Sequence, residues 1–342
     1  MNDWNALLDF LDPISLHAIS EDQGFSDGQI GTKVSAYEDE FPDLTEADVV
    51  IVGCNETRGS WQLFRELCAP DKVRTQFYSS YYWHKDVKIA DIGNIRNGAS
   101  LNDSAAALKM VVKELTAAGK TVIILGGSHD LTLSQYEAYV DQKRLIEAVC
   151  VDALIDINLN SSNRNENFLM EILTGEPNYI RHYNHIGFQS YYVHPRMLET
   201  MDKLRFDCFR LGNVKENIDE MEPVIRNCQM LSFDISAIAH PFAPASRLSP
   251  NGFNGEESCQ LMRYAGLSPN LSSIGIYGFI PEHDRDELTA KQIGHMLWYF
   301  IDGRSRGRRE AHIDEKDAFN EYHTAFRSEE HTSELQSHLN LV

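Results

Sequence analysis

Short runs of β-branched and other apolar residues recur along the chain and are separated by stretches with helical periodicity. The runs lie at 47–53, 121–127, 146–152, 184–188, 229–235 and 272–279. Their residues are continuously apolar and do not alternate with polar ones, which is typical of strands covered on both faces of a sheet. The pattern therefore predicts a single α/β domain with a doubly wound, mainly parallel sheet and helices on both faces.

The stretches between the runs supply the helices. Residues 103–120 place apolar side chains at helical spacing, with Asp103 or Ser104 as the expected N-cap and Gly119 near the end. Further helices are expected at 195–205, 215–227, 255–266 and 286–303. No internal repeat or long linker divides the chain, so we expect an N-terminal segment at 1–44 and one α/β domain at 45–303.

The last sixteen residues, RSEEHTSELQSHLNLV, show no sustained apolar period and no helix cap. They resemble the translation of a sequencing adapter. We therefore expect an adapter-derived tail at 327–342 that follows a truncated C-terminal region at 304–326. The alternative is an ordinary polar terminus.

Charge and cysteine usage limit the partners and the compartment. Acidic residues number 51 and basic residues 31, and no Lys or Arg run offers a stripe for phosphates, so neither nucleic acid nor an anionic membrane is an expected partner. No window approaches the roughly 20 apolar residues of a membrane span. Six scattered cysteines without a C-x-x-C pair, and no signal peptide, indicate a cytoplasmic protein with reduced thiols.

Side chains that bind metals follow three of the predicted strands. His129 comes after 121–127, Asp152 is the last residue of 146–152 with Asp156 four positions later, and Asp234 ends LSFD within 229–235. Ligands of open α/β sheets bind beyond the carboxyl ends of the strands, so these four side chains could converge there. Alone, each has a plain alternative, a loop histidine or a helix-capping aspartate. Together, one imidazole and three carboxylates suit Mn²⁺ or Mg²⁺.

Three motifs resemble those of the ureohydrolase family, which comprises arginases, agmatinases and formimidoylglutamases. GGSHD (126–130) is similar to the family's G-G-D-H-S, DALID (152–156) to D-A-H-x-D, and SFDISAIAHPFAPA (232–245) to S-x-D-x-D-x-x-D-P-x-x-A-P. APDKVR (69–74) fits upstream, and 206–236 with 250–266 resembles a divergent arginase-like branch of the Bacteroidetes. The resemblance implies an arginase-like α/β fold and a homo-oligomer.

The resemblance also implies two Mn²⁺ ions sharing a hydroxide that attacks an amidine or guanidine carbon. By position, His129, Asp152, Asp156 and Asp234 match the ligands of one ion. The second ion would share two of these aspartates but would need a His where Leu154 stands and an Asp where Ser236 stands. The resemblance therefore implies one Mn²⁺ at most, or none.

Other positions depart from the family pattern or match it only in part. Leu169 falls near the family's loop histidine, and His240 stands where the third motif ends in Asp. Glu257 matches the glutamate that faces the cationic amidine, with Glu256 as the neighbouring alternative; either could instead be a charge at a helix N-terminus. By this resemblance Glu257 and Asp156 are the catalytic residues.

The function expected from the resemblance is metal-dependent hydrolysis of a linear amidine C–N bond, as in formimidoylglutamases, on a small cationic amidine or guanidine. The first alternative is a non-catalytic member that keeps the fold as a binding or regulatory protein. A third interpretation is a Mg²⁺-binding structural domain with an unrelated role. Leu154 and Ser236 favour a non-catalytic protein, whereas the four surviving ligands favour a metal-dependent role.

Overall fold

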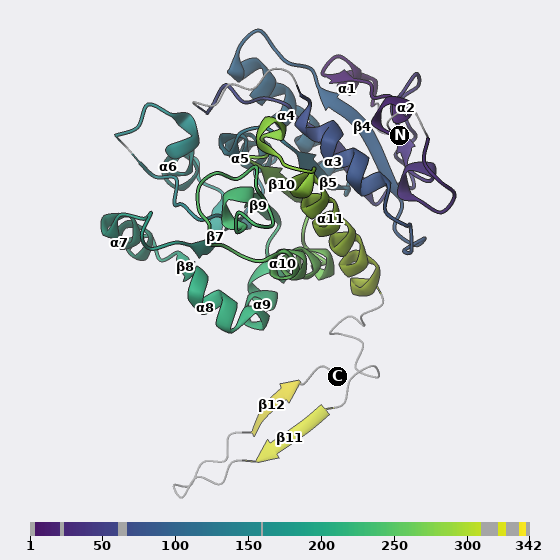
Figure 1. Cartoon of the computed structure of the whole chain (residues 1–342). Helices are drawn as coiled ribbons and strands as arrows, with labels where there is room; N and C mark the ends of the chain where they lie inside the picture. Colours follow the sequence, from purple (N-terminus) through teal and green to yellow (C-terminus); the bar gives the residue numbers. More distant parts are fainter. Residues whose placement is uncertain are drawn as a thin grey trace, which may run out of the picture.

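A computed structural model describes residues 4–20, 24–60, 67–158, 160–308, 321–325 and 335–339 (Figure 1). A ten-stranded sheet forms its centre, in the order β1-β4-β3-β5-β10-β9-β6-β7-β8, with β2 paired to β4. The strands are β1 (Leu11–Asp12), β2 (Ser35–Ala36), β3 (Val49–Gly53), β4 (Ile89–Ile95), β5 (Thr121–Leu125), β6 (Ile146–Val151), β7 (Ile180–Phe188), β8 (Asp207–Arg210), β9 (Met230–Asp234) and β10 (Ser273–Tyr277). Within this sheet β1 runs antiparallel to β4, and the other pairings are parallel.

The helices alternate with the strands along the chain. They are α1 (Asn5–Leu8), α2 (Leu16–Ile19), α3 (Ala69–Tyr78), α4 (Leu101–Ala117), α5 (Thr132–Asp141), α6 (Phe168–Thr174), α7 (Pro195–Lys203), α8 (Leu211–Glu216), α9 (Met221–Arg226), α10 (Gly255–Leu267) and α11 (Leu288–Gly307). Short 3₁₀ turns at Ile30–Thr32, His129–Leu131, Arg164–Glu166, Ile218–Glu220, Ile235–Ala237 and Pro281–His283 connect them. This alternation confirms the predicted α/β class.

Both faces of the sheet are buried, as the continuous apolar runs predict. In β3, Val49 and Ile51 pack with residues of α3, α10 and α11, whereas Val50 and Val52 pack on the other face with α4 and α5. Farther along the sheet, α6 and α7 extend that second layer over β6. At about 25 cal/mol per Å² of buried apolar surface, such two-sided burial is the main stabilising contribution for these strands. The six predicted strands are all present.

Three elements differ from the sequence expectation. The helix expected at 103–120 begins earlier, because Ser100 is its N-cap and Asp103 closes a capping box with it. The helix expected at 215–227 is divided into α8 and α9, because Asn217 leaves the helical conformation at φ −140° and ψ 57°. The helix expected at 286–303 continues to Gly307.

Strand β4 was not expected because Asp91 and Asn94 interrupt its apolar run. Both are held by Arg74 of α3, which is fully buried. The Arg74 guanidinium donates to both Asp91 oxygens, from Nε at 2.7 Å and from Nη2 at 3.0 Å, and Nη1 donates to Asn94 Oδ1 at 2.5 Å. Tyr78 also donates to Asp91. This network lets polar residues lie inside a buried strand.

The C-terminal region contains a separate two-stranded antiparallel sheet, β11 (Glu321–Ala325) with β12 (Leu335–Leu339), drawn apart from the main domain in Figure 1. The rest of the predicted tail at 327–342 lies outside the described residues. Among the helices that are described, none combines the length and the apolar content needed to cross a bilayer.

Candidate metal centre

Four adjacent strands, β5, β10, β9 and β6, end at the same edge of the sheet, and the predicted ligands follow three of them. His129 lies in the turn after β5, Asp234 ends β9, and Asp152 follows β6 directly. Asp156 lies one short loop beyond Asp152. All four side chains are nearly inaccessible to solvent. The parallel sheet therefore brings together residues that are more than one hundred positions apart.

The three carboxylates surround one nitrogen of the histidine ring. The distances from His129 Nδ1 are 3.1 Å to Asp156 Oδ2, 3.3 Å to Asp152 Oδ2 and 3.7 Å to Asp234 Oδ2. These separations are far below the 8 Å or so at which one ion could no longer reach all four side chains. The structure thus brings the three aspartates around His129, and their role as metal ligands stays a prediction.

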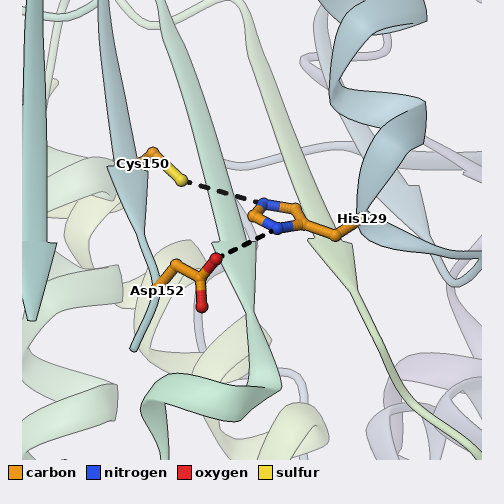
Figure 2. Close-up of side chains that lie close together, drawn as sticks. All are labelled: His129, Cys150 and Asp152. Atoms are coloured by element: carbon orange, nitrogen blue, oxygen red, sulfur yellow. Dashed lines mark hydrogen bonds and ion pairs between the residues drawn. The ribbon is translucent and has the colours of Figure 1, made fainter. Parts of the chain in front are cut away.

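The other ring nitrogen of His129, Nε2, contacts side chains on the side of the ring opposite to the carboxylates. His129 Nε2 lies 3.0 Å from Ser232 Oγ, which in turn lies 2.6 Å from Thr132 Oγ1. Cys150 Sγ is 3.7 Å from the same nitrogen, and Figure 2 shows the ring between Cys150 and Asp152. These contacts fix the ring so that Nδ1 faces the carboxylates.

Sequence reasoning missed Cys150 as a neighbour of the site. Cys150, His129 and Asp152 can each offer a ligand atom within 4.8 Å of the others. Cys150 contacts Nε2, however, whereas the aspartates face Nδ1, and one ion cannot bind both nitrogens of a ring. The available signal was the two-residue spacing of Cys150 and Asp152, which places side chains on the same face of a strand.

The second oxygens of Asp152 and Asp234, both Oδ1, face Ser236. Its hydroxyl donates to Asp152 Oδ1 at 2.5 Å, and its backbone amide donates to Asp234 Oδ1 at 2.7 Å. The Leu154 amide adds a third hydrogen bond, to Asp152 Oδ1 at 3.1 Å. In both Asp152 and Asp234, one oxygen thus faces His129 and the other faces Ser236.

Burial and charge shift the pKa values in this cluster strongly. Burial disfavours a charged His129, but Cys150 and the aspartates outweigh it and hold the pKa of the imidazole well above its usual value. Burial, followed by repulsion from Asp152, raises the pKa of Asp156 well above its usual range, and burial raises the pKa of Asp234 to about 6. The raised pKa values of Asp156 and Asp234 indicate that the buried cluster disfavours three ionised carboxylates beside one imidazole.

The cluster opens into a cavity of about 310 Å³. Gly278, just after β10, forms part of its wall at φ +78°, and a Cβ there would lie 2.6 Å from Asp234 Oδ2. Glycine is thus required where the backbone approaches this carboxylate. The other lining residues are Thr57, Ser60, Gly127, Ser128, His129, Asp152, Leu154, Asp156, Asn165, Asp234, Ile235, Ser236, Ala245, Ser246, Arg247, Leu248, Phe279 and Ile280.

The positions that depart from the ureohydrolase pattern lie as follows. Leu154 and Ser236 both line the cavity beside the aspartates. Leu169 is buried in the apolar cluster under α6. His240 is exposed, and its Nδ1 lies 3.2 Å from the Ser246 carbonyl. Leu154 and Leu169 carry no ligand atom, and the Ser236 hydroxyl is hydrogen-bonded to Asp152.

Glu257 lies outside the set of residues that line this cavity. Its carboxylate accepts a hydrogen bond from the Asn254 amide at 2.8 Å, which completes a capping box at the start of α10. Lys215 Nζ lies 2.6 Å from the same oxygen, Oε2. Glu256 is exposed. The contacts of Glu257 are those of a helix-capping charge, and its predicted role toward substrate has no support from them.

Comparison with known proteins places this arrangement in a family. A sequence profile described as the arginase family matches residues 47–302. The chain belongs to the arginase family, and the ureohydrolase resemblance of its motifs is confirmed.

The similar proteins of known type are enzymes of that family. The chain is 24% identical to an agmatinase of Photorhabdus laumondii over 60% of its own length and 67% of the relative's. It is 23% identical to a formimidoylglutamase of Vibrio cholerae, over 67% and 75% of the two chains.

Solved structures share the fold at low sequence identity. Formimidoylglutamase from Bacillus subtilis superposes with a TM-score of 0.72 at 17% identity and covers 83% of this chain and 94% of its own. Trypanosoma cruzi formiminoglutamase with Mn²⁺ gives a TM-score of 0.71 at 15% identity, over 82% and 99%. These likenesses establish an arginase-like fold.

Proposed function

We propose that this protein hydrolyses a C–N bond of a linear amidine, as formimidoylglutamases do, using one divalent metal ion. The observation that carries the proposal is the convergence of His129, Asp152, Asp156 and Asp234 on one point at the floor of a cavity. Membership of the arginase family supports the class of reaction. The substrate class is a small amidine or guanidine.

The four side chains suit a single hard cation. Ligands about 2.1 Å from an ion in octahedral geometry lie about 3 Å from their neighbours, close to the shortest separations around His129 Nδ1. One nitrogen and three carboxylate oxygens match Mn²⁺, and the ion would also balance the negative charge of the cluster. When bound, such an ion makes water nucleophilic at neutral pH.

The chain itself would orient the His129 ring and enclose the substrate in part. Ser232 and Cys150 hold the His129 ring, and the cavity walls limit access of water to the bound amidine. In the net reaction the oxygen of water bonds to the amidine carbon, the C–N bond breaks, and the nitrogen leaves as ammonia or an amine with the protons of water. Asp156, the predicted catalytic carboxylate, would lie beside the reacting centre of this proposed site.

A non-catalytic family member is the second candidate, and two observations favour it. Leu154 presents an apolar side chain where a second ion would need an imidazole, and Glu257 is engaged by Lys215 away from the cavity. Such a protein would bind a metal or an amidine without turnover.

Metal content and turnover measured on one sample separate these functions. The protein is purified in Mn²⁺, its metal content per chain is measured by mass spectrometry, and it is assayed with formimidoylglutamate, agmatine and arginine. One ion with amidine hydrolysis supports the enzyme, one ion without turnover supports the non-catalytic protein, and no ion contradicts the metal site.

A pair of variants tests the ligand set itself. The Asp156→Asn variant should lose the ion, because the change removes one of the three carboxylates among the four proposed ligands. Asp130→Asn is the matched control, since Asp130 is equally buried and follows His129 in sequence but accepts its hydrogen bond from Ser128, at 2.5 Å. Equal metal content in both variants would contradict the assignment of Asp156.

We also propose that the protein works in the cytoplasm. All six cysteines, Cys54, Cys68, Cys150, Cys208, Cys228 and Cys259, are free thiols in the structure. Free buried thiols are typical of proteins in reducing compartments. Cell fractionation of the tagged protein checks this location.

A further inference from the structure

Ser236 contacts two of the proposed metal ligands at once, through two different groups. Its hydroxyl donates to Asp152 Oδ1 at 2.5 Å and its amide to Asp234 Oδ1 at 2.7 Å. Asp152 follows β6 and Asp234 ends β9, so Ser236 connects carboxylates that belong to separate strands. Their other oxygens, both Oδ2, face His129 Nδ1.

The two hydrogen bonds differ in what they imply. The amide bond to Asp234 is the ordinary N-cap of the 3₁₀ turn Ile235–Ala237, and a local turn suffices to explain it. The hydroxyl bond to Asp152 spans 84 positions of sequence and no local motif requires it. It lies beside the cavity, at an oxygen that already accepts from the Leu154 amide. A carboxylate oxygen with two donors is oriented and partly neutralised.

We propose that Ser236 is a positioning residue that does by hydrogen bonding what a second cation does in a two-ion site. Its hydroxyl and amide hold the Oδ1 atoms of Asp152 and Asp234, so that both Oδ2 atoms face the single ion bound with His129. This inference rests on the proposed metal site. It goes further because it assigns Ser236 a role in binding one ion. The site would then be adapted to a single ion and would not simply lack the ligands of a second one.

The hydroxyl is tested with three variants and Mn²⁺ as the probe. Ser236→Ala removes the hydroxyl and keeps the amide, and should weaken Mn²⁺ binding about 10- to 100-fold, the effect usual for residues that orient metal ligands. The stoichiometry should stay at one ion. Ser236→Thr keeps the hydroxyl and should restore most of the affinity. Ser246→Ala is the control, since Ser246 lines the same cavity but contacts Ala243 and His240 through its backbone.

The metal-free protein is titrated with Mn²⁺. Binding is monitored by calorimetry and by the electron paramagnetic resonance signal of free Mn²⁺. Melting temperatures of the metal-free variants show that each is folded. A merely structural role for Ser236 would lower the melting temperature and leave the dissociation constant unchanged.

The outcomes separate this inference from the proposed function. Mn²⁺ bound by Ser236→Ala as tightly as by the unmodified protein overturns the positioning role and leaves the one-ion site standing. Two ions bound by the unmodified protein also overturn it, because the hydroxyl would then not replace a cation. An unmodified protein that takes up no ion refutes the metal site and the inference with it.

Discussion

Leu154 and Ser236 stand at the two positions where the family resemblance predicts that ligands of a second ion are missing. Changing both, Leu154→His with Ser236→Asp, supplies an imidazole and a carboxylate beside Asp152 and Asp234. We expect Mn²⁺ occupancy to rise from about one toward two per chain, because an apolar side chain no longer faces the second position. Metal analysis after dialysis checks the number.

The same double variant need not gain activity over the unmodified protein while Leu169 and His240 remain. The unmodified protein could instead bind a second ion fully or show arginase-like turnover with Leu154 in place. Either result would show that the site does not need a His at position 154 and an Asp at position 236. The single variant Leu154→His is the matched control, because Ser236 still donates to Asp152 there.

The role of Glu257 can be decided by separating stability from binding. Glu257→Ala removes the capping box of α10 and the contact with Lys215, so the free energy of unfolding should fall by about 1 kcal/mol. Mn²⁺ affinity should not change. Urea denaturation and metal titration measure both quantities.

Glu256→Ala, at the exposed neighbouring position, is the control for Glu257 and should change neither quantity. A large loss of amidine turnover in Glu257→Ala with unchanged stability would instead restore the substrate-facing role that the sequence resemblance implies. This result would also mean that Lys215 releases the carboxylate when substrate binds.

The residues of the site differ in how well they can be predicted from the sequence. His129, Asp152, Asp156 and Asp234 could be predicted because each follows an apolar run, and parallel strands bring their ends together. Ser232 could not, since it lies inside an apolar strand where a small polar side chain is usually part of the core, and Cys150 differed from a core thiol only by its two-residue spacing from Asp152. Their role depends on which neighbour faces them across the sheet.

At the scale of elements, β4 depends on one buried ion pair. Arg74→Met should destabilise the fold by about 3–5 kcal/mol, because it leaves the fully buried Asp91 without its charge partner. Arg96→Met is the control, since the Arg96 and Asp12 side chains are more than half exposed and such a pair contributes about 1 kcal/mol or less. Thermal or urea unfolding of both variants gives the comparison.

A small effect of Arg74→Met would mean that the buried network is dispensable for β4. The double variant Arg74→Met with Asp91→Leu distinguishes a lost pair from an unpaired charge. It should recover part of the stability, because both buried charges are then removed together.

Elements with a continuous apolar run were predictable from sequence, and those that depend on partners were not. The runs that became β3, β5, β6, β9 and β10 are buried on both faces, so composition alone identifies them. Strand β4 contains polar residues that only Arg74 makes acceptable in a core. Strand β8 is a partly exposed edge with little apolar content. The division between α8 and α9 at Asn217 is a backbone feature that periodicity does not show.

At the scale of the whole molecule, the tail at 327–342 should contribute nothing to the stability of the α/β domain. Truncation after Phe326 should leave the melting temperature unchanged, because an adapter-derived peptide was never selected to bury surface. Differential scanning calorimetry of the two chains tests this. A decrease of several degrees would mean that Leu335 and Leu339 stabilise the protein, and truncation after Gly307 would then locate the effect.

Self-association remains a prediction based on the family resemblance. Light scattering coupled to size-exclusion chromatography should give a mass that is a multiple of 38.9 kDa. If residues 304–326 take part in the interface, removing them should yield a monomer. A monomer at micromolar concentration for the full chain would contradict the prediction.

The place of β10 in the sheet has a consequence for synthesis of the chain. β10 lies between β5 and β9, yet it is made after every other strand of the ten-stranded sheet. A nascent chain that lacks β10 can form two half-sheets, each with an open edge, one carrying His129 and the other Asp152 and Asp234. The imidazole and the carboxylates meet only when residues near Gly278 have left the ribosome. In the proposed metal site, capture of the ion would therefore wait until nearly the whole domain has been made.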